Sequence, residues 1–248
     1  MGMIILWLRA ILFNLAFFGI TTLWVVGGVP TLLLGERVYY PYIMGWFGTV
    51  ALIEKYILGL TYRVIGTEHL PPAPYIVAMS HQSAWETLKL FKLFPHAAIV
   101  MKKELTEIPF WGRFAKATDP LPLDRNAGKG ALNGLIDYAR RTVIEQCRPI
   151  VIFPQGTRVR VGQKMPYKIG VAKIYEALQL PIVPVAINAG VFWPKNSFFK
   201  RGGVVTVQIL PPIAVGLTAA QAIAQIEQTL ETHTHALCQM AIKEISLT

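Results

Sequence analysis

Apolar residues are concentrated at the start of the chain. No charged residue lies between Arg9 and Glu36. At ~1.5 Å per residue, a helix of this length could cross the ~30 Å hydrocarbon core of a bilayer. A cleaved signal peptide fits less well, because the apolar run is long and has no small-x-small cleavage site. The pattern therefore predicts a membrane anchor.

The anchor has two possible forms, because glycine and proline interrupt the apolar run at residues 27–30 and a proline inside a helix removes a backbone hydrogen bond. One form is a single spanning helix that ends near Gly27. The other is a helical hairpin that turns at residues 27–30 and returns through residues 31–34. A second apolar stretch, residues 43–60, is expected to lie at the membrane interface. Residues 1–60 are thus assigned to the anchor.

Beyond the anchor, short runs of β-branched residues alternate with apolar residues at helical spacing. Strands are predicted at residues 62–66, 75–79, 97–101, 149–153, 182–187 and 204–209. Helices are predicted at residues 83–94, 109–117 and 130–146, and a last one begins at Thr218, where Gln221 completes a capping box. This alternation predicts one α/β domain over residues 61–248.

The net positive charge of the chain comes from its middle segment. The net charge is +10, and hydrophobic residues make up 53% against 15% charged, which excludes a disordered chain. Between Lys89 and Lys173 there are 16 basic and 6 acidic residues, which accounts for the whole net charge. A basic region beside an anchor favours anionic lipids or phosphorylated substrates and a cytoplasmic location. Nucleic acid is not expected, because no nucleic-acid-binding signature is present.

Several kinds of site are excluded by their missing motifs. The two cysteines, Cys147 and Cys238, are too few for a disulfide framework or a four-cysteine zinc site. His233 and His235 are two residues apart on a predicted helix and so face different directions, which makes them a poor metal pair. No nucleophile elbow or Walker A motif appears. No metal site is expected.

His81 and Glu86 form the first candidate site, between a predicted strand and a predicted helix. A histidine can accept a proton near neutral pH, and a carboxylate that reaches its other ring nitrogen would orient it. Because no serine or cysteine nucleophile has a recognisable setting, such a pair would activate a hydroxyl of the substrate. The alternative is structural, since Ser83 and Glu86 together have the spacing of a capping box.

A second candidate site follows two other predicted strands, at residues 102–103 and 153–158. Gly156 allows close approach of a phosphate, and Arg158 offers a bidentate fork. In open α/β sheets, sites form at the carboxyl ends of strands, which would bring these residues near His81. An ordinary turn with a surface arginine is the alternative. The phosphate-binding candidates are Lys102, Lys103, Gly156, Thr157 and Arg158.

Taken together, these segments resemble the glycerolipid acyltransferases, specifically the bacterial 1-acyl-sn-glycerol-3-phosphate acyltransferases. The resemblance rests on four blocks in the order of that family: His81-x4-Glu86, residues 102–112, residues 153–158 and residues 180–185. It implies a single mixed sheet flanked by helices. It also implies a bacterial inner membrane location, with the catalytic domain on the cytoplasmic face.

The resemblance further implies a reaction. His81, oriented by Glu86, would act as general base on the sn-2 hydroxyl of lysophosphatidic acid, and the product would be phosphatidic acid. Lys102 and Arg158 would hold the phosphate, with Lys103 and Thr157 as lesser candidates. The acyl donor would be a thioester of acyl carrier protein or of coenzyme A. No metal or other cofactor is implied, because a thioester is already activated.

Two residues depart from the family pattern, which usually has Asp in place of Glu86 and Glu in place of Gln155. Glu86 keeps the charge on a longer arm, and Gln155 leaves the surrounding loop more positive. The acceptor could therefore be another lysophospholipid, a lyso-aminolipid or glycerol 3-phosphate. A non-catalytic tether that binds anionic lipid through the basic region is a different class of function.

Overall fold

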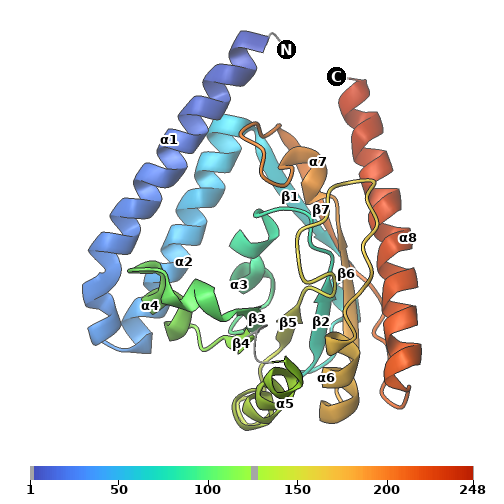
Figure 1. Ribbon diagram of the computed structural model, residues 1–248. Coiled ribbons are helices and arrows are strands. Elements are labelled where there is room, and N and C mark those ends of the chain that lie inside the picture. Colours follow the sequence, from blue (N-terminus) through green and yellow to red (C-terminus); the bar gives the residue numbers. More distant parts are fainter. Residues whose placement is uncertain (1–2, 124–127, 248) are drawn as a thin grey trace.

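The computed structural model describes residues 3–123 and 128–247 (Figure 1). A seven-stranded sheet runs through the centre in the order β1-β7-β6-β2-β5-β3-β4. Among the pairs of described strands, β6 and β7 pair antiparallel and the others parallel, so the sheet is mixed, as the resemblance implies. The strands are β1 (Leu60–Ile65), β2 (Ile76–Met79), β3 (Ala98–Lys102), β4 (Leu121–Leu123), β5 (Ile150–Ile152), β6 (Ile182–Ile187) and β7 (Gly203–Ile209).

Helices flank the sheet and precede it. The α-helices are α1 (Met3–Gly28), α2 (Glu36–Ile53), α3 (Leu90–Leu93), α4 (Trp111–Ala117), α5 (Gly128–Ala139), α6 (Gly170–Leu178), α7 (Ala189–Phe192) and α8 (Ala219–Ser246). Short 3-10 helices are η1 (Val29–Leu33), η3 (Thr67–His69), η4 (Glu86–Leu88) and η5 (Lys103–Glu107), and π-helices are η2 (Glu54–Leu58) and η6 (Arg140–Ile144). The predicted capping box at Thr218 and Gln221 begins α8, with both of its hydrogen bonds present.

The sheet has an apolar layer on each face. Along β2, Val77 and Met79 belong to the hydrophobic cluster that includes α2 and α3, whereas Ile76 and Ala78 belong to the cluster with α5, α6 and α8. Successive side chains of a strand point to opposite faces, so a strand covered on both sides must be apolar throughout. This burial explains why the β2 and β6 segments are continuous apolar runs, and it confirms the predicted α/β fold.

The carboxyl ends of four parallel strands, β2, β3, β5 and β6, lie at one edge of the sheet. The next residues along the chain are Ser80-His81 after β2 and Phe153 after β5, while Lys102 ends β3. Since β2 pairs directly with β5, and β5 with β3, the two candidate sites are brought to neighbouring positions.

The two N-terminal helices form an antiparallel hairpin beside the domain (Figure 1). The side chains of α2 hold α1, because Tyr42 Oη donates to the carbonyl of Trp24 at 2.8 Å and Trp46 Nε1 donates to Thr21 Oγ1 at 3.2 Å. The α-helix of α1 ends at Gly28, close to the end near Gly27 in the first predicted form, whereas the return through residues 31–34 in the second form is wrong. The helix of α1 continues past Gly27 into η1, so residues 31–34 do not return, and the chain reverses only before α2.

By length and composition, one helical stretch among the described residues, Ile4–Leu33, could cross a membrane. Only 11% of it is buried, so it is not a core helix of the domain. The second apolar stretch has another environment. Ile43, Phe47 and Val50 of α2 are buried in the same cluster as the sheet, which places α2 between α1 and the domain.

Two local elements differ from their predictions. Residues 83–94 were expected to form one helix, but the structure has η4 followed by the single turn of α3. The capping box considered as the structural alternative is only half formed, because Glu86 Oε1 accepts the backbone N–H of Ser83, whereas Ser83 Oγ accepts from Trp85 rather than from Glu86. The short strand β4 was missed, because it contains Pro122 and lies at the edge of the sheet, where a proline is tolerated.

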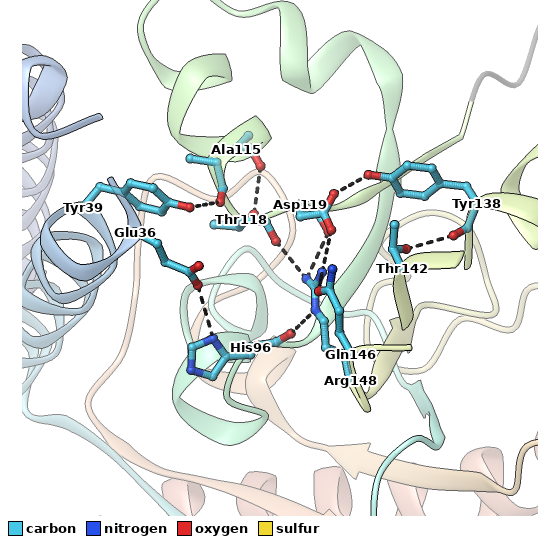
Figure 2. Close-up of polar contacts among 11 residues, drawn as sticks. Glu36, Tyr39, His96, Ala115, Thr118, Asp119, Tyr138, Thr142, Gln146 and Arg148 are labelled. Carbon is cyan, nitrogen blue, oxygen red and sulfur yellow. Dashed lines mark hydrogen bonds and ion pairs between the residues drawn. The ribbon is translucent and has the colours of Figure 1, made fainter. Parts of the chain in front are cut away.

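Arg148, just before β5, fixes the elements around one side of the domain (Figure 2). It donates to the carbonyl oxygens of His96 and Thr118 at 2.7 and 3.0 Å, and to the carboxylate of Asp119 at 2.7 Å. The other carboxylate oxygen of Asp119 accepts from the hydroxyl of Tyr138 on α5. These contacts tie the end of α4 and the C-terminal end of α5 to the sheet.

Candidate functional site

The centre of the site is the pair formed by His81 and Glu86. His81 Nδ1 lies 2.8 Å from Glu86 Oε1. The same oxygen accepts the backbone N–H groups of Gln82 and Ser83, each at 2.7 Å. The Glu86 side chain is 0% exposed, so water does not compete for it. Glu86 therefore stabilises the backbone turn and contacts the histidine with one oxygen, which combines the functional and the structural interpretation.

The contact with Glu86 determines the tautomer of His81. A carboxylate only accepts hydrogen bonds, so Nδ1 carries the proton and donates it to Glu86 Oε1. The other ring nitrogen, Nε2, is then unprotonated in the neutral imidazole and can accept a proton. His81 is 15% exposed and lines the large cavity of the protein, so a substrate can reach this nitrogen.

The loop after β5 holds the imidazole from the other side. The ring of Phe153 stacks on that of His81, with 4.0 Å between the centroids and 20° between the planes. The backbone N–H of Val159 donates to the carbonyl of His81 at 2.7 Å. The ring is thus fixed by stacking on one face and by Glu86 at Nδ1, which leaves little freedom about its χ angles.

Cationic and small residues line the same cavity as His81. Gly156 adopts a φ of +67°, a left-handed conformation that side-chain-bearing residues rarely adopt. This turn directs the two residues that follow it toward the cavity. Of the predicted phosphate-binding residues, four line it: Lys102, Gly156, Thr157 and Arg158.

The set of lysines that line the cavity differs from the prediction at two positions. Lys103 is exposed at the start of η5 and is not among the residues that line the cavity, so the structure does not bring it to the other candidates. Lys168 does line the cavity and was missed. Its backbone N–H donates to the carbonyl of Pro154 at 2.8 Å, which joins its segment to the loop after β5. No sequence spacing signals this, since the contact spans an irregular loop.

The rest of the cavity is apolar. Its volume is about 940 Å³, within the range of cavities that hold large organic ligands. The hairpin contributes Trp24, Tyr42 and Trp46 to its wall, and α5 contributes Leu132 and Leu135. The cavity thus combines a base and three cations with an apolar lining, which suits an amphiphile with an anionic head.

A buried ion pair lies behind the His81 loop. Lys89 Nζ is 2.8 Å from Glu54 Oε2, and Trp85 Nε1 donates to the same oxygen at 3.3 Å. Burial lowers the pKa of Lys89, and the charge of Glu54 opposes that shift. The pair connects the end of the hairpin to the residue that precedes Glu86, so it contributes to the position of the carboxylate.

Gln155 faces away from the cavity. Its side chain is 5% exposed and its Nε2 donates to the hydroxyl of Tyr167 at 3.1 Å. The departure from the family pattern at this position therefore does not alter the cavity wall directly. Within residues 3–123 and 128–247, no group of three histidine, cysteine or acidic side chains is placed to hold a metal. Cys147 and Cys238 are both unpaired thiols.

Comparisons with a family model and with known proteins indicate the same family. Residues 61–188 match the family model described as Acyltransferase. A Pseudomonas aeruginosa protein named 1-acyl-sn-glycerol-3-phosphate acyltransferase is 32% identical over 200 residues, which cover 80% of this chain and 77% of that protein. A Saccharomyces cerevisiae protein of the same name is 30% identical over 220 residues, covering 86% and 71% of the two chains.

A solved structure with a high TM-score shows the same fold. It is the crystal structure of the 1-acyl-sn-glycerophosphate (LPA) acyltransferase from Thermotoga maritima, with a TM-score of 0.73 and 21% sequence identity. The alignment covers 93% of this chain and 96% of that one, so the likeness includes the N-terminal hairpin as well as the sheet.

Proposed function

The chain belongs to the acyltransferase family, among its 1-acyl-sn-glycerol-3-phosphate acyltransferases, and from this premise we propose that His81 and Glu86 carry out acyl transfer to the sn-2 hydroxyl of lysophosphatidic acid. The observation that supports this assignment is the 2.8 Å contact between His81 Nδ1 and Glu86 Oε1, made at the wall of a cavity that also contains cations and a wide apolar space.

The proposed reaction needs no group beyond the two substrates and these side chains. His81 Nε2 takes the proton of the sn-2 hydroxyl while the hydroxyl oxygen bonds to the carbonyl carbon of the acyl thioester. The tetrahedral intermediate then collapses, the carbon–sulfur bond breaks, and the imidazolium returns its proton to the departing thiolate. Glu86 stabilises the imidazolium between these steps. The products are phosphatidic acid and the free thiol of acyl carrier protein or coenzyme A.

The cationic residues are proposed to bind the phosphate of the acceptor. Arg158 and Lys102 line the cavity with His81, and Lys168 joins them there. A guanidinium binds phosphate with two parallel charge-assisted hydrogen bonds, whereas a lysine contributes a point charge. The apolar walls from the hairpin and α5 would take an acyl chain.

The protein is proposed to sit in the bacterial cytoplasmic membrane, with the domain on the cytoplasmic face. Apolar side chains of α1 such as Leu8, Leu15 and Leu23 are exposed, as in a helix surrounded by lipid. The basic residues of the domain fit an anionic cytoplasmic leaflet. The cavity wall contributed by α1 and α2 would let a lysolipid enter from the bilayer.

The activity is tested with membranes from cells that produce the protein, supplied with an acyl thioester and lysophosphatidic acid. We expect phosphatidic acid to form, the activity to stay with the membranes after an alkaline wash, and protease to abolish it only in inside-out vesicles. A panel of glycerol 3-phosphate and other lysolipids serves as comparison. Product from one of these acceptors, but not from lysophosphatidic acid, would contradict the proposed acceptor. The assignment of the reaction as acyl transfer would still hold.

Arg158→Ala is expected to raise the KM for lysophosphatidic acid about 10- to 100-fold, because a charge-assisted contact with the phosphate is lost. The KM for the thioester should stay close to that of the wild type. Arg160→Ala is the matched control, since Arg160 is exposed and lies outside the cavity wall. An unchanged KM with a lower kcat would instead place Arg158 in the transition state.

A further inference from the structure

A chain of three side chains supports the loop that carries Arg158 from behind. Gln155 Nε2 donates to the hydroxyl oxygen of Tyr167 at 3.1 Å, and this hydroxyl donates to Glu231 Oε1 of α8 at 3.0 Å. We refer to Gln155, Tyr167 and Glu231 as the relay. None of the three lines the cavity, so the relay acts on the site through position rather than through contact with substrate.

The direction of the relay is fixed by its chemistry. The phenol of Tyr167 has one proton, and the Glu231 carboxylate can only accept it. The phenol oxygen is then an acceptor toward residue 155, so this residue must donate, which an amide does and a carboxylate cannot. Burial and the charge of Glu231 both raise the pKa of Tyr167, so the phenol keeps its proton.

The relay joins the two segments that present cations. Gln155 is three residues before Arg158, and Tyr167 directly precedes Lys168. Between the same segments runs the backbone hydrogen bond from Lys168 to Pro154. Glu231 then attaches both segments to α8, which packs on β6 and α6. The separation of the two cations is therefore set by a short, part-buried connection.

We propose that Gln155, Tyr167 and Glu231 are positioning residues that fix Arg158 relative to Lys168, and that the acid on α8 makes an amide necessary at position 155. This inference rests on the proposed function, because it concerns residues that position the cations proposed to bind the phosphate. A carboxylate at 155 would face Glu231 across a single phenolic proton. One of the two acids would then lose its hydrogen bond or take up a proton, and the loop would shift.

The test is a charge exchange in the full-length protein. Gln155→Glu is expected to raise the KM for lysophosphatidic acid about tenfold, with kcat and the thioester KM within about twofold of the wild type. In Gln155→Glu/Glu231→Gln the relay reverses: Tyr167 donates to the acid at 155 and accepts from the amide at 231. We expect the KM to return to within about threefold of the wild type.

Two single variants separate charge from hydrogen bonding. Glu231→Gln keeps a complete neutral relay and should stay within about threefold of the wild-type KM, like the exposed control Glu244→Gln on the same helix. Tyr167→Phe removes the hydroxyl without adding charge, and serves if Gln155→Glu does not fold. It should raise the acceptor KM about tenfold. A wild-type KM in Tyr167→Phe or Gln155→Glu, or a double variant no better than Gln155→Glu, would overturn the proposal.

Hydrogen exchange distinguishes a failure of the relay from a failure of the proposed function. The reporters are the amides of Gly156 and Lys168, which donate to the carbonyls of Phe153 and Pro154. In detergent micelles, Tyr167→Phe should speed their exchange about tenfold. If the wild type transferred acyl groups to no acceptor, the proposed function would fail, but hydrogen exchange would still test the relay. Faster exchange in Tyr167→Phe would support the relay, and unchanged exchange would overturn it.

Discussion

Replacing His81 with alanine is expected to lower kcat by a factor on the order of 10² to 10⁴ while the protein stays in the membrane fraction. His81 is the one imidazole in the described cavity wall, and no serine or cysteine with a partnered base replaces it there. The measurement is acyl transfer by membranes that contain equal amounts of wild type and variant. His235→Ala is the control, because His235 is exposed on α8.

The outcome also separates an enzyme from a lipid-binding tether. A tether would keep its function in His81→Ala and lose it when the basic residues are reversed in charge. Equal turnover of His81→Ala and wild type would remove His81 from the mechanism. In that case the contact with Glu86 would serve only the loop after β2.

Glu86→Gln has the second large expected effect, a decrease in kcat of about 10²-fold or more. The amide oxygen can still accept from Gln82 and Ser83, so the turn is retained, but no negative charge supports the imidazolium of His81. The other carboxylate oxygen is buried and has no hydrogen-bond partner among the described residues. In the variant this place would be taken by an NH2 group without an acceptor, or the amide would flip.

The roles of Glu86 are resolved by measuring kcat together with the midpoint of thermal unfolding. Glu86→Asp keeps the charge on a shorter arm and is expected to retain more activity than Glu86→Gln. Glu86→Ala leaves the donors of His81, Gln82 and Ser83 without their common acceptor, and should lower the free energy of unfolding by about 2–4 kcal/mol. A fully active Glu86→Gln would mean that the carboxylate serves the backbone alone.

Some local sequence patterns predicted the structure correctly. Apolar, β-branched runs such as residues 182–187 predicted strands correctly, because burial on both faces leaves no place for a polar side chain. The capping box at Thr218 was correct because its two hydrogen bonds form within a single turn. The order of the four motif blocks, from His81 to residues 180–185, was enough to identify the family.

Elsewhere, contacts made by side chains overrode the local helix pattern. The Ser83–Glu86 spacing is that of a cap, yet Glu86 turns toward His81 and the expected helix is reduced to η4 and α3. Lys89 in the same segment is buried against Glu54 of the preceding π-helix. The contact between Lys89 and Glu54 has no signature in residues 83–94, since its partner is brought by the fold, whereas the contact between His81 and Glu86 joins residues five apart and was predicted from the sequence.

The sequence by itself determined the chemistry that is available: a histidine and an acid five residues apart, a glycine-turned loop with an arginine, an apolar anchor and an alternating α/β pattern. Only the tertiary structure decided which groups act together. It brought Lys168 to the cavity, left Lys103 outside it, and placed Gln155 behind the loop with Glu231. The reason is geometric. Strand order and loop path set these distances, and both depend on contacts between residues far apart in the chain, which local spacing does not encode.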